Sequence, residues 1–280
     1  MTAAATLVDT TSPFGTYRTR GLARFAWRLA DWHDLAPALR KKLRAVVARL
    51  FAGPFDTEVE GLRFRLYPGS NYDDRKILAR QRLPERAERR FLAAHLHEGT
   101  VFVDVGANVG SYSLAAARCG ATVLAVEANP ETAGRLAFNI AANGLADIDV
   151  ATVAVGEGCG TMDLWSEPSN CGFATLVPEL TEEWQGDWRA RQVRVQPLAE
   201  ILTGYGVKRV DVLKVDVEGY EDRVLLPYIR ATEPSDHPGA ILLETNCREH
   251  WQEDCLAVLA TFGYLAEGET EDNVLLRRFA

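Results

Sequence analysis

The sequence of 280 residues has no long apolar run, few cysteines and no excess of positive charge. No run approaches the roughly 20 apolar residues that cross a bilayer, so we expect no membrane-spanning helix. The five cysteines are odd in number and form no C-x-x-C pair, which argues against a disulfide framework or a zinc site. Residues 1–11 lack the charged and apolar segments of an export signal, so we expect a cytoplasmic protein. The net charge of −8 argues against nucleic acid as the main partner.

The N-terminal part differs in charge from the rest of the chain. Residues 1–17 predict a disordered leader, and 18–49 carry nine Lys/Arg against two Asp, a local charge of +7 that leaves the remainder near −15. Apolar residues recur there at roughly helical spacing, and Pro37 predicts a break between two helices. The segment is either a basic amphipathic element for an anionic membrane surface or acidic partner, or a helical cap whose arginines face water. We therefore separate an N-terminal leader and basic extension (1–54) from the main domain (55–280).

The most informative stretch is VFVDVGANVGSYS at residues 101–113. Its first five residues are apolar except for Asp104 and rich in β-branched valine, which predicts a strand buried on both faces. Gly106 and Gly110 then permit a tight turn and a close approach of backbone to a ligand. Small and apolar residues follow and predict a helix. Strand, glycine turn and helix in this order form a nucleotide-type site at the mouth of an α/β sheet.

The residues of this turn distinguish between two kinds of cofactor. A dinucleotide-binding loop reads G-x-G-x-x-G, whereas here the pattern is Asp104-x-Gly106-x-Asn108-x-Gly110. A carboxylate beside the loop would repel a diphosphate but suits a ligand with a cationic amine. Glu127, at the end of the next apolar run, can accept both hydroxyls of a ribose. An amino-acid cation and a ribose together point to S-adenosylmethionine.

The remaining pattern predicts strands that alternate with helices, and therefore a parallel sheet with right-handed crossovers. A hairpin is expected over 55–67, and a terminal hairpin makes the last strand antiparallel. The expected strands of the sheet span 101–105, 122–127, 148–155, 210–216 and 240–246, followed by two near the C-terminus. The expected helices span 84–97, 111–119, 130–142 and 249–262.

The regular alternation breaks between residues 156 and 197. The stretch 166–186 is long and polar, which predicts a functional lid, and 193–196 alternates like an edge strand. Three tryptophans in or near this stretch either form a stacking wall for a sugar or flat polyketide, or hold the loop on its own domain.

Acidic residues collect where the later strands end. Asp216 is the first candidate for a catalytic carboxylate, and Glu218 follows it on the same loop. Lys214, two residues before Asp216, is either a base with a lowered pKa or part of a structural ion pair. Asp216, Glu244 and Asn246 supply three oxygen ligands of the kind that Mg²⁺ prefers, or they only bind loop amides and substrate hydroxyls.

Three segments together resemble the FkbM family of S-adenosylmethionine-dependent methyltransferases, over roughly residues 55–280. They are DVGANVGSYS at 104–113, EANP at 127–130 and LKVDVEGYE at 213–221. The resemblance implies the class I methyltransferase fold, a Rossmann-like sheet of seven strands in the order 3-2-1-4-5-7-6, here with an N-terminal helical and hairpin extension. It also implies O-methyl transfer to hydroxyls of macrolides, sugars or glycolipids. By motif position, the methionine part would be held by Asp104, Gly106, Asn108 and Gly110. The ribose would be held by Glu127 with Asn129. The adenine would lie near Ala154 and Val155.

The prediction is therefore a methyltransferase that uses S-adenosylmethionine, with Mg²⁺ as a second cofactor to be tested and a small molecule or carbohydrate as acceptor. Two alternatives remain open: a nicotinamide-dependent oxidoreductase, which the missing G-x-G-x-x-G disfavours, and a non-catalytic binding module with the same fold. An exposed edge strand or the basic N-terminal helices could each support a homodimer.

Overall fold

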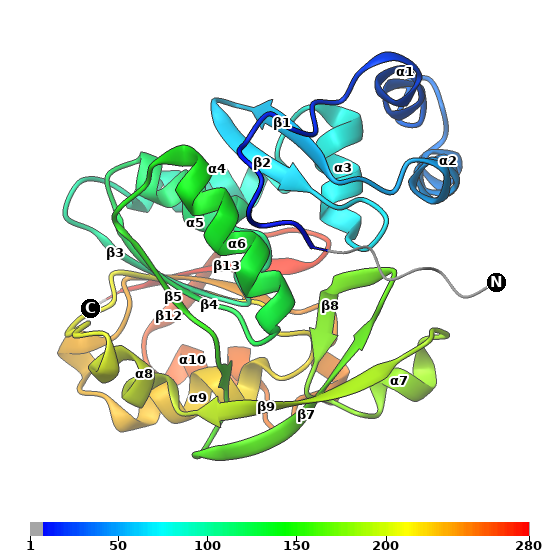
Figure 1. Cartoon of the computed structure of the whole chain (residues 1–280). Helices are drawn as coiled ribbons and strands as arrows, with labels where there is room; N and C mark the ends of the chain where they lie inside the picture. Colours follow the sequence, from blue (N-terminus) through cyan, green and yellow to red (C-terminus); the bar gives the residue numbers. More distant parts are fainter. Residues whose placement is uncertain (1–7, 280) are drawn as a thin grey trace.

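The computed structural model describes residues 8–279, and its centre is a seven-stranded sheet between two layers of helices (Figure 1). Across the sheet the strands are β12 (Tyr264–Glu269), β13 (Asn273–Arg278), β11 (Ala240–Glu244), β10 (Val212–Val215), β3 (Val101–Val105), β4 (Thr122–Val126) and β5 (Ile148–Ala151). The neighbours from β5 to β11 pair in parallel, whereas β13 is antiparallel to both β11 and β12. Numbered along the chain, this is the order 3-2-1-4-5-7-6, so the predicted sheet and its antiparallel last strand are confirmed.

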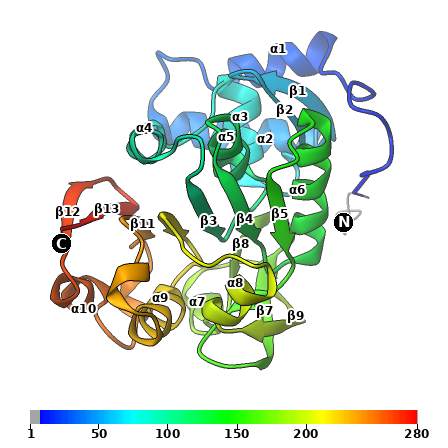
Figure 2. The ribbon, with the colours of Figure 1, turned by 90° about the vertical axis from the view of Figure 1, so that its left-hand side faces the viewer.

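The side chains of each strand alternate between two hydrophobic cores, one on each face of the sheet. On β3, Phe102 belongs to one core, while Val103 and Val105 belong to the other. The first face is covered by α4 (Arg86–His95), α5 (Ser111–Arg118) and α6 (Pro130–Asn143), and the second by α8 (Leu198–Gly204), α9 (Glu221–Ala231) and α10 (Cys255–Thr261) (Figures 1 and 2). Lys214 on β10 lies in register with Asp104 on β3, so the two side chains share a face.

Helix ends follow local capping residues. Asn129 accepts a hydrogen bond from the N–H of Glu131, and Gly144 ends α6 with φ +65°, as predicted. The predicted helix 249–262 is too long: a 3₁₀ turn (η2, Arg248–His250) comes first, and α10 begins only after Asp254. The carboxylate of Asp254 accepts the N–H groups of Leu256 and Ala257, which fixes this later start.

The region predicted to be a lid is a second, four-stranded sheet, which we call the inserted sheet. Its order is β6 (Ala154–Val155), β9 (Arg189–Gln196), β7 (Gly160–Glu167) and β8 (Asn170–Thr175), with α7 (Leu180–Glu183) after β8. The prediction of one strand over 148–155 is thus wrong, because the chain leaves the main sheet after β5 and pairs with β9 through β6. The expected polar loop is also partly wrong. In β8 the buried side chains alternate as Cys171, Phe173 and Thr175, among small and polar neighbours.

The N-terminal part forms two helices and a hairpin, namely α1 (Gly21–Leu29), α2 (Pro37–Leu50), β1 (Phe55–Val59) and β2 (Leu62–Leu66). The break at Pro37 and the hairpin are as predicted. The expected disorder is wrong for residues 8–17, because the buried guanidinium of Arg65 donates hydrogen bonds to the carbonyls of Asp9, Ser12 and Pro13; residues 1–7 lie outside the described part. The division at residue 54 stays a prediction. Among residues 8–279, no helix has the length and apolar character to cross a membrane.

Helix α3 (Tyr72–Arg80) is absent from the predictions. Its side-chain cap is Asn71, which accepts the N–H groups of Asp73 and Asp74. The turn residues at 67–72 hid this start, because they read as a loop rather than as the approach to a helix. The helix matters for function because it forms one wall of the cavity described next.

Candidate functional site

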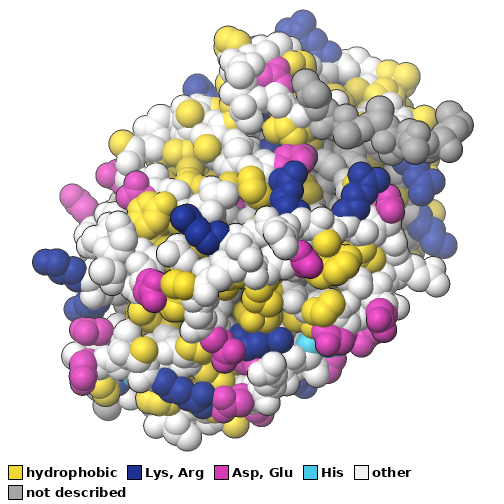
Figure 3. Space-filling model, turned by 60° about the horizontal axis from the view of Figure 1, so that its bottom comes forward, with side chains coloured by type: hydrophobic (Ala, Val, Ile, Leu, Met, Phe, Trp, Pro, Cys, Tyr) yellow, Lys and Arg dark blue, Asp and Glu magenta, His cyan; other side chains and the backbone are white. Residues whose placement is uncertain are grey.

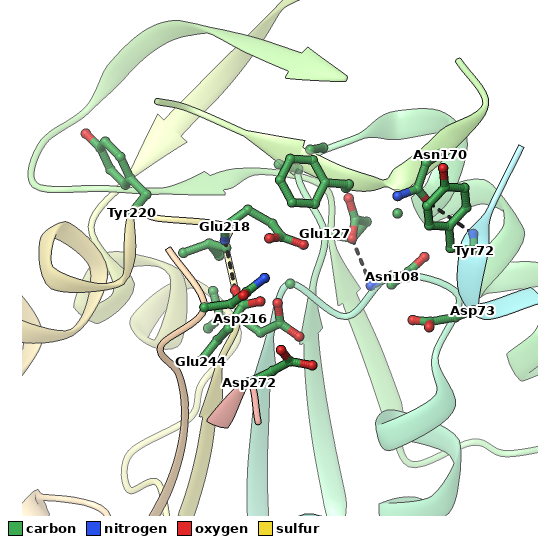
Figure 4. Close-up of a pocket in the computed structure, with 18 of the residues that line it drawn as sticks. Tyr72, Asp73, Asn108, Glu127, Asn170, Asp216, Glu218, Tyr220, Glu244 and Asp272 are labelled. Atoms are coloured by element: carbon green, nitrogen blue, oxygen red, sulfur yellow. Dashed lines mark hydrogen bonds between the residues drawn. The ribbon is translucent and has the colours of Figure 1, made fainter. Parts of the chain in front are cut away.

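A cavity of about 290 Å³ lies where the carboxyl ends of β3, β4, β10 and β11 meet, the usual place for a ligand in an open α/β sheet. Its other walls come from α3, the inserted sheet and the turn between β12 and β13. Figure 4 shows its polar side chains in two groups, with Asn108 and Glu127 on one side and Asp216, Glu218 and Glu244 on the other. The structure thus brings together the four strand ends that the sequence singled out.

The glycine loop after β3 brings bare backbone to the edge of this cavity. Gly106 has φ +79°, and a Cβ there would lie 1.7 Å from the carbonyl oxygen of Asp216. Its N–H donates to the carbonyl of Val126, which ties the loop to the end of β4. Gly110, with φ +94°, lies at the start of α5 and outside the lining of the cavity. Of the two predicted glycines, only Gly106 therefore lies where a ligand can touch it.

Glu127 is held in place by two backbone amides. One carboxylate oxygen accepts the N–H of Asn108 at 2.9 Å, and the other accepts the N–H of Asn129 at 2.8 Å. Burial raises the pKa of Glu127 to about 7, although both amides favour the charged form. Asn108 and Glu127 line the cavity, whereas Asn129 acts from behind as the cap of α6. The carboxylate is thus oriented to accept donors from a ligand.

Asp104 lies beneath the loop and does not line the cavity. It is fully buried, accepts a hydrogen bond from Ser113 Oγ at 2.5 Å, and faces Lys214 Nζ at 3.5 Å. Lys214 Nζ also lies 2.9 Å from Asp216 and donates to the carbonyl of Gly106 at 3.2 Å. The structure therefore gives Asp104 and Lys214 supporting positions, with Asp216 alone of the three reaching the cavity.

The surroundings of Lys214 favour the structural ion pair over a base with a lowered pKa. Burial disfavours the ammonium, but attraction by Asp216 and Asp104 outweighs burial and raises the pKa of Lys214 above its ordinary value. Its ammonium therefore links the ends of β3 and β10.

Three carboxylates converge on the other side of the cavity. Oxygens of Asp216, Glu218 and Glu244 all lie within 4.8 Å of one another (Figure 4). Burial and the neighbouring Asp216 raise the pKa of both Glu218 and Glu244 well above the ordinary value. Of the predicted metal ligands, Asp216 and Glu244 belong to this cluster, Glu218 joins them, and Asn246 lies in the cavity lining. One oxygen of Glu218 is buried and has no hydrogen-bond partner among the described residues.

The loop that carries this cluster is held by Glu221, which the sequence reasoning left without a role. One oxygen of Glu221 accepts the N–H of Val217 at 2.9 Å, and the other accepts Nε1 of Trp251 at 2.7 Å. Its contacts also include the N–H of Gly219. These bonds stabilise the backbone turn in which Glu218 has φ +56°.

Further polar residues line the cavity from outside the predicted set. Glu85, before α4, accepts a hydrogen bond from Tyr112 Oη at 2.6 Å, and burial together with nearby Asp73 raises its pKa to about 7. Asp272 enters from the turn between β12 and β13 (Figure 4). Neither residue follows a parallel strand. The rule that ligands bind at the carboxyl ends of the strands therefore does not indicate them.

The inserted sheet and the residues before it form the apolar wall. Ala154 and Val155, the residues expected near an adenine, line the cavity. Trp184 also lines it and stacks on Phe173, with ring centroids 4.6 Å apart. Trp188 instead donates its indole N–H to the carbonyl of Trp184 at 2.8 Å. Trp184 therefore lies where a stacking wall was expected, whereas Trp188 holds the loop on its own domain.

The comparison with protein families agrees with this site. The family model described as the methyltransferase FkbM domain matches residues 104–262, more than half of the chain and both halves of the cavity. The chain belongs to the FkbM methyltransferase family. Its central sheet has the strand order that membership of this family implies.

Among curated proteins, methyltransferase sdnD of Sordaria araneosa is 31% identical over 159 residues, which are 47% of this chain. The match spans 61% of that relative, less than two thirds of its length. Two similar solved structures are a TehB-like methyltransferase from Corynebacterium glutamicum (12% identity, TM-score 0.43, 74% of this chain and 94% of that one) and an O-methyltransferase from Thermotoga maritima (14% identity, TM-score 0.42, 71% and 67%).

Proposed function

We propose that the protein transfers a methyl group from S-adenosylmethionine to a hydroxyl oxygen of a small molecule, sugar, glycolipid or polyketide. The observation that carries this proposal is a single cavity with two chemically different sides. One side has an oriented carboxylate beside a bare glycine loop, and the other has a cluster of carboxylates. The first suits a nucleoside and the second suits an acceptor that must lose a proton.

The residues on the first side fit S-adenosylmethionine. Gly106 lets the loop after β3 pack against the end of β10, because a side chain there would overlap Asp216. Glu127 can accept two ribose hydroxyls, since each oxygen keeps a free lone pair beside its amide bond. Ala154 and Val155 offer apolar surface to an adenine ring. When bound, the cofactor supplies a methyl group on a positively charged sulfur, which is already activated for transfer.

The chain must then align the acceptor and take up its proton. Asp216 is the candidate general base, because it reaches the cavity and is fixed by Lys214 at 2.9 Å. Glu218 is a second candidate on the same loop. Lys214 acts as a positioning residue in this proposal, because its ammonium also binds the carbonyl of Gly106 and so links the two sides.

A divalent cation at the carboxylate cluster belongs to the same proposal. Asp216, Glu218 and Glu244 offer oxygen ligands close enough for one ion. The buried oxygen of Glu218 has no hydrogen-bond partner among the described residues, and a bound cation would satisfy it. Mg²⁺ held there would orient an acceptor hydroxyl and favour its ionised form. The amide of Asn246 is a further candidate ligand.

The test is calorimetric titration with S-adenosylmethionine and its demethylated product, followed by a screen of hydroxylated sugars and polyketides for methyl transfer. Binding of both nucleosides in the micromolar range is expected. Folded protein that binds neither would rule out the proposal, and binding of NAD instead would support the oxidoreductase alternative. If the protein is a non-catalytic module, it would bind the nucleoside, and Asp216→Ala would leave the activity of any complex with a partner unchanged.

A further inference from the structure

Exposed apolar side chains are concentrated at the N-terminal end of the protein. Of the twelve large apolar residues that are exposed among the described residues, seven lie between positions 22 and 50. Three of them, Leu22 (72% exposed), Phe25 (63%) and Leu29 (50%), lie on α1 at positions i, i+3 and i+7. This spacing places them on one face of the helix. Trp32 follows directly after the helix and is also exposed.

The opposite side of α1 holds the helix on the protein. Trp27 and Ala30 are buried, so the exposed stripe is a second apolar face and not a failure to pack. Helix α2 repeats this arrangement, with Ala48 buried and a further exposed stripe on another face. The residues of that stripe are Leu39, Val46 and Leu50. Exposed apolar stripes on both helices favour the other interpretation of residues 18–49, an amphipathic element for a surface.

Unpaired arginines lie on the flank of α1 between its apolar stripe and the buried Trp27. Arg20, Arg24 and Arg28 are exposed, and none lies within 4 Å of a carboxylate among residues 8–279. The end of the molecule that Figure 3 brings forward is different, because acidic and basic side chains are interspersed there. The charge of the protein is therefore separated, with +7 over residues 18–49 and about −15 over the rest.

We propose that α1 and α2 dock on the surface of an anionic phospholipid bilayer. The apolar stripe of α1 would enter the boundary between headgroups and acyl chains, and Arg24 and Arg28 would contact lipid phosphates. The acidic remainder of the protein is repelled by the same surface, which fixes one orientation. A second copy of the chain fits less well, because symmetric pairing through this face would bring two segments of charge +7 together. The inference does not depend on the proposed reaction.

The experiment is co-sedimentation of the full chain with vesicles of phosphatidylcholine alone or mixed with phosphatidylglycerol. We expect binding only to the mixed vesicles, weakened by salt. Phe25→Ser should reduce the partition coefficient about tenfold or more, because an exposed apolar anchor is lost. Arg24→Glu combined with Arg28→Glu should reduce it about thirtyfold or more. The matched control is Leu265→Ser, since Leu265 is 56% exposed on the edge strand β12, away from α1 (Figure 1).

Several outcomes would overturn the docking inference. They are absence of binding to both vesicle types, equal binding to both, or an equal loss in the Leu265→Ser control. Sedimentation velocity without lipid is the remaining measurement. A dimer that Phe25→Ser converts to a monomer would assign the face to a second copy instead. Because all substituted side chains are exposed, an unchanged urea midpoint for each variant separates loss of docking from loss of folding.

Discussion

The carboxylate of Glu127, at the end of β4, accepts the backbone N–H of Asn108 from the loop after β3 at 2.9 Å. This bond joins two adjacent strands at the point where the proposed nucleoside would lie. Because the carboxylate is oriented before a ligand arrives, little freedom is lost when the ribose hydroxyls bind. Most of the predictions below follow from this relationship and from its counterpart around Lys214.

Glu127→Gln should weaken binding of S-adenosylmethionine by about 10- to 100-fold, because the charge is lost and the amide NH2 cannot accept a hydrogen bond from a ribose hydroxyl. Isothermal titration calorimetry measures the change. Glu157→Gln is the control, since Glu157 is exposed. Equal affinities of the wild type and Glu127→Gln would show that the ribose lies elsewhere.

Binding of S-adenosylmethionine should strengthen as the pH rises through about 7. Burial raises the pKa of Glu127 to about 7, so the group is largely protonated at pH 6 and largely ionised at pH 8. Only the ionised carboxylate accepts hydrogen bonds from both ribose hydroxyls. Binding is therefore coupled to release of a proton, and the affinity grows with pH. Titrations at pH 6, 7 and 8 test the sign, and Glu127→Gln should remove this part of the dependence.

Gly106→Ala should destabilise the fold by about 2 kcal/mol or more and abolish nucleoside binding. The new Cβ would meet the carbonyl oxygen of Asp216 at 1.7 Å, in a backbone conformation with φ +79°. Gly144→Ala is a matched control, because Gly144 also has positive φ but nothing lies within 4 Å of its Cβ position. Urea denaturation compares the two. A similar loss for both would attribute the effect to backbone strain alone.

Lys214→Met should reduce the free energy of unfolding by about 3–5 kcal/mol, because it leaves the fully buried Asp104 without its cation. Adding Asp104→Asn should recover much of the loss, since the buried pair is then replaced by neutral groups. Urea denaturation of both variants tests this. If the double variant is no more stable than the single one, the ion pair is not the cause.

Mg²⁺ should bind with release of protons, because the pKa values of Glu218 and Glu244 are raised well above the ordinary value without an ion. Titration in two buffers of different ionisation enthalpy measures the proton release, and Glu244→Gln should abolish binding. Turnover that survives exhaustive chelation would contradict a catalytic role for the ion.

Much of the central sheet could be predicted from the sequence, because its strands are buried runs separated by glycine and proline. The same runs placed Asp216 and Glu127 at strand ends, and parallel topology brings those ends together. The role of Asp104 could not be read in this way. Spacing shows that a carboxylate precedes the loop, but only the register with Lys214 shows that it lies beneath the loop.

The inserted sheet and α3 escaped prediction for a related reason. Strand β8 contains glycine, asparagine and cysteine, so its alternation is visible only as burial against its neighbours. Glu85 and Asp272 reach the cavity from turns whose position depends on how distant segments pack. Residues of this kind are specified by tertiary structure, and no local pattern marks them.

The pairing of β6 with β9 has a consequence for engineering. Ala154 and Val195 are partners across these strands, so the chain leaves and re-enters the body of the protein at neighbouring points. The segment between them, including Trp184, therefore has adjacent ends, but its residues Leu164, Leu176 and Leu180 pack into the core of the main sheet. Exchanging this segment between relatives should therefore succeed only when the core residues that it packs against are exchanged with it.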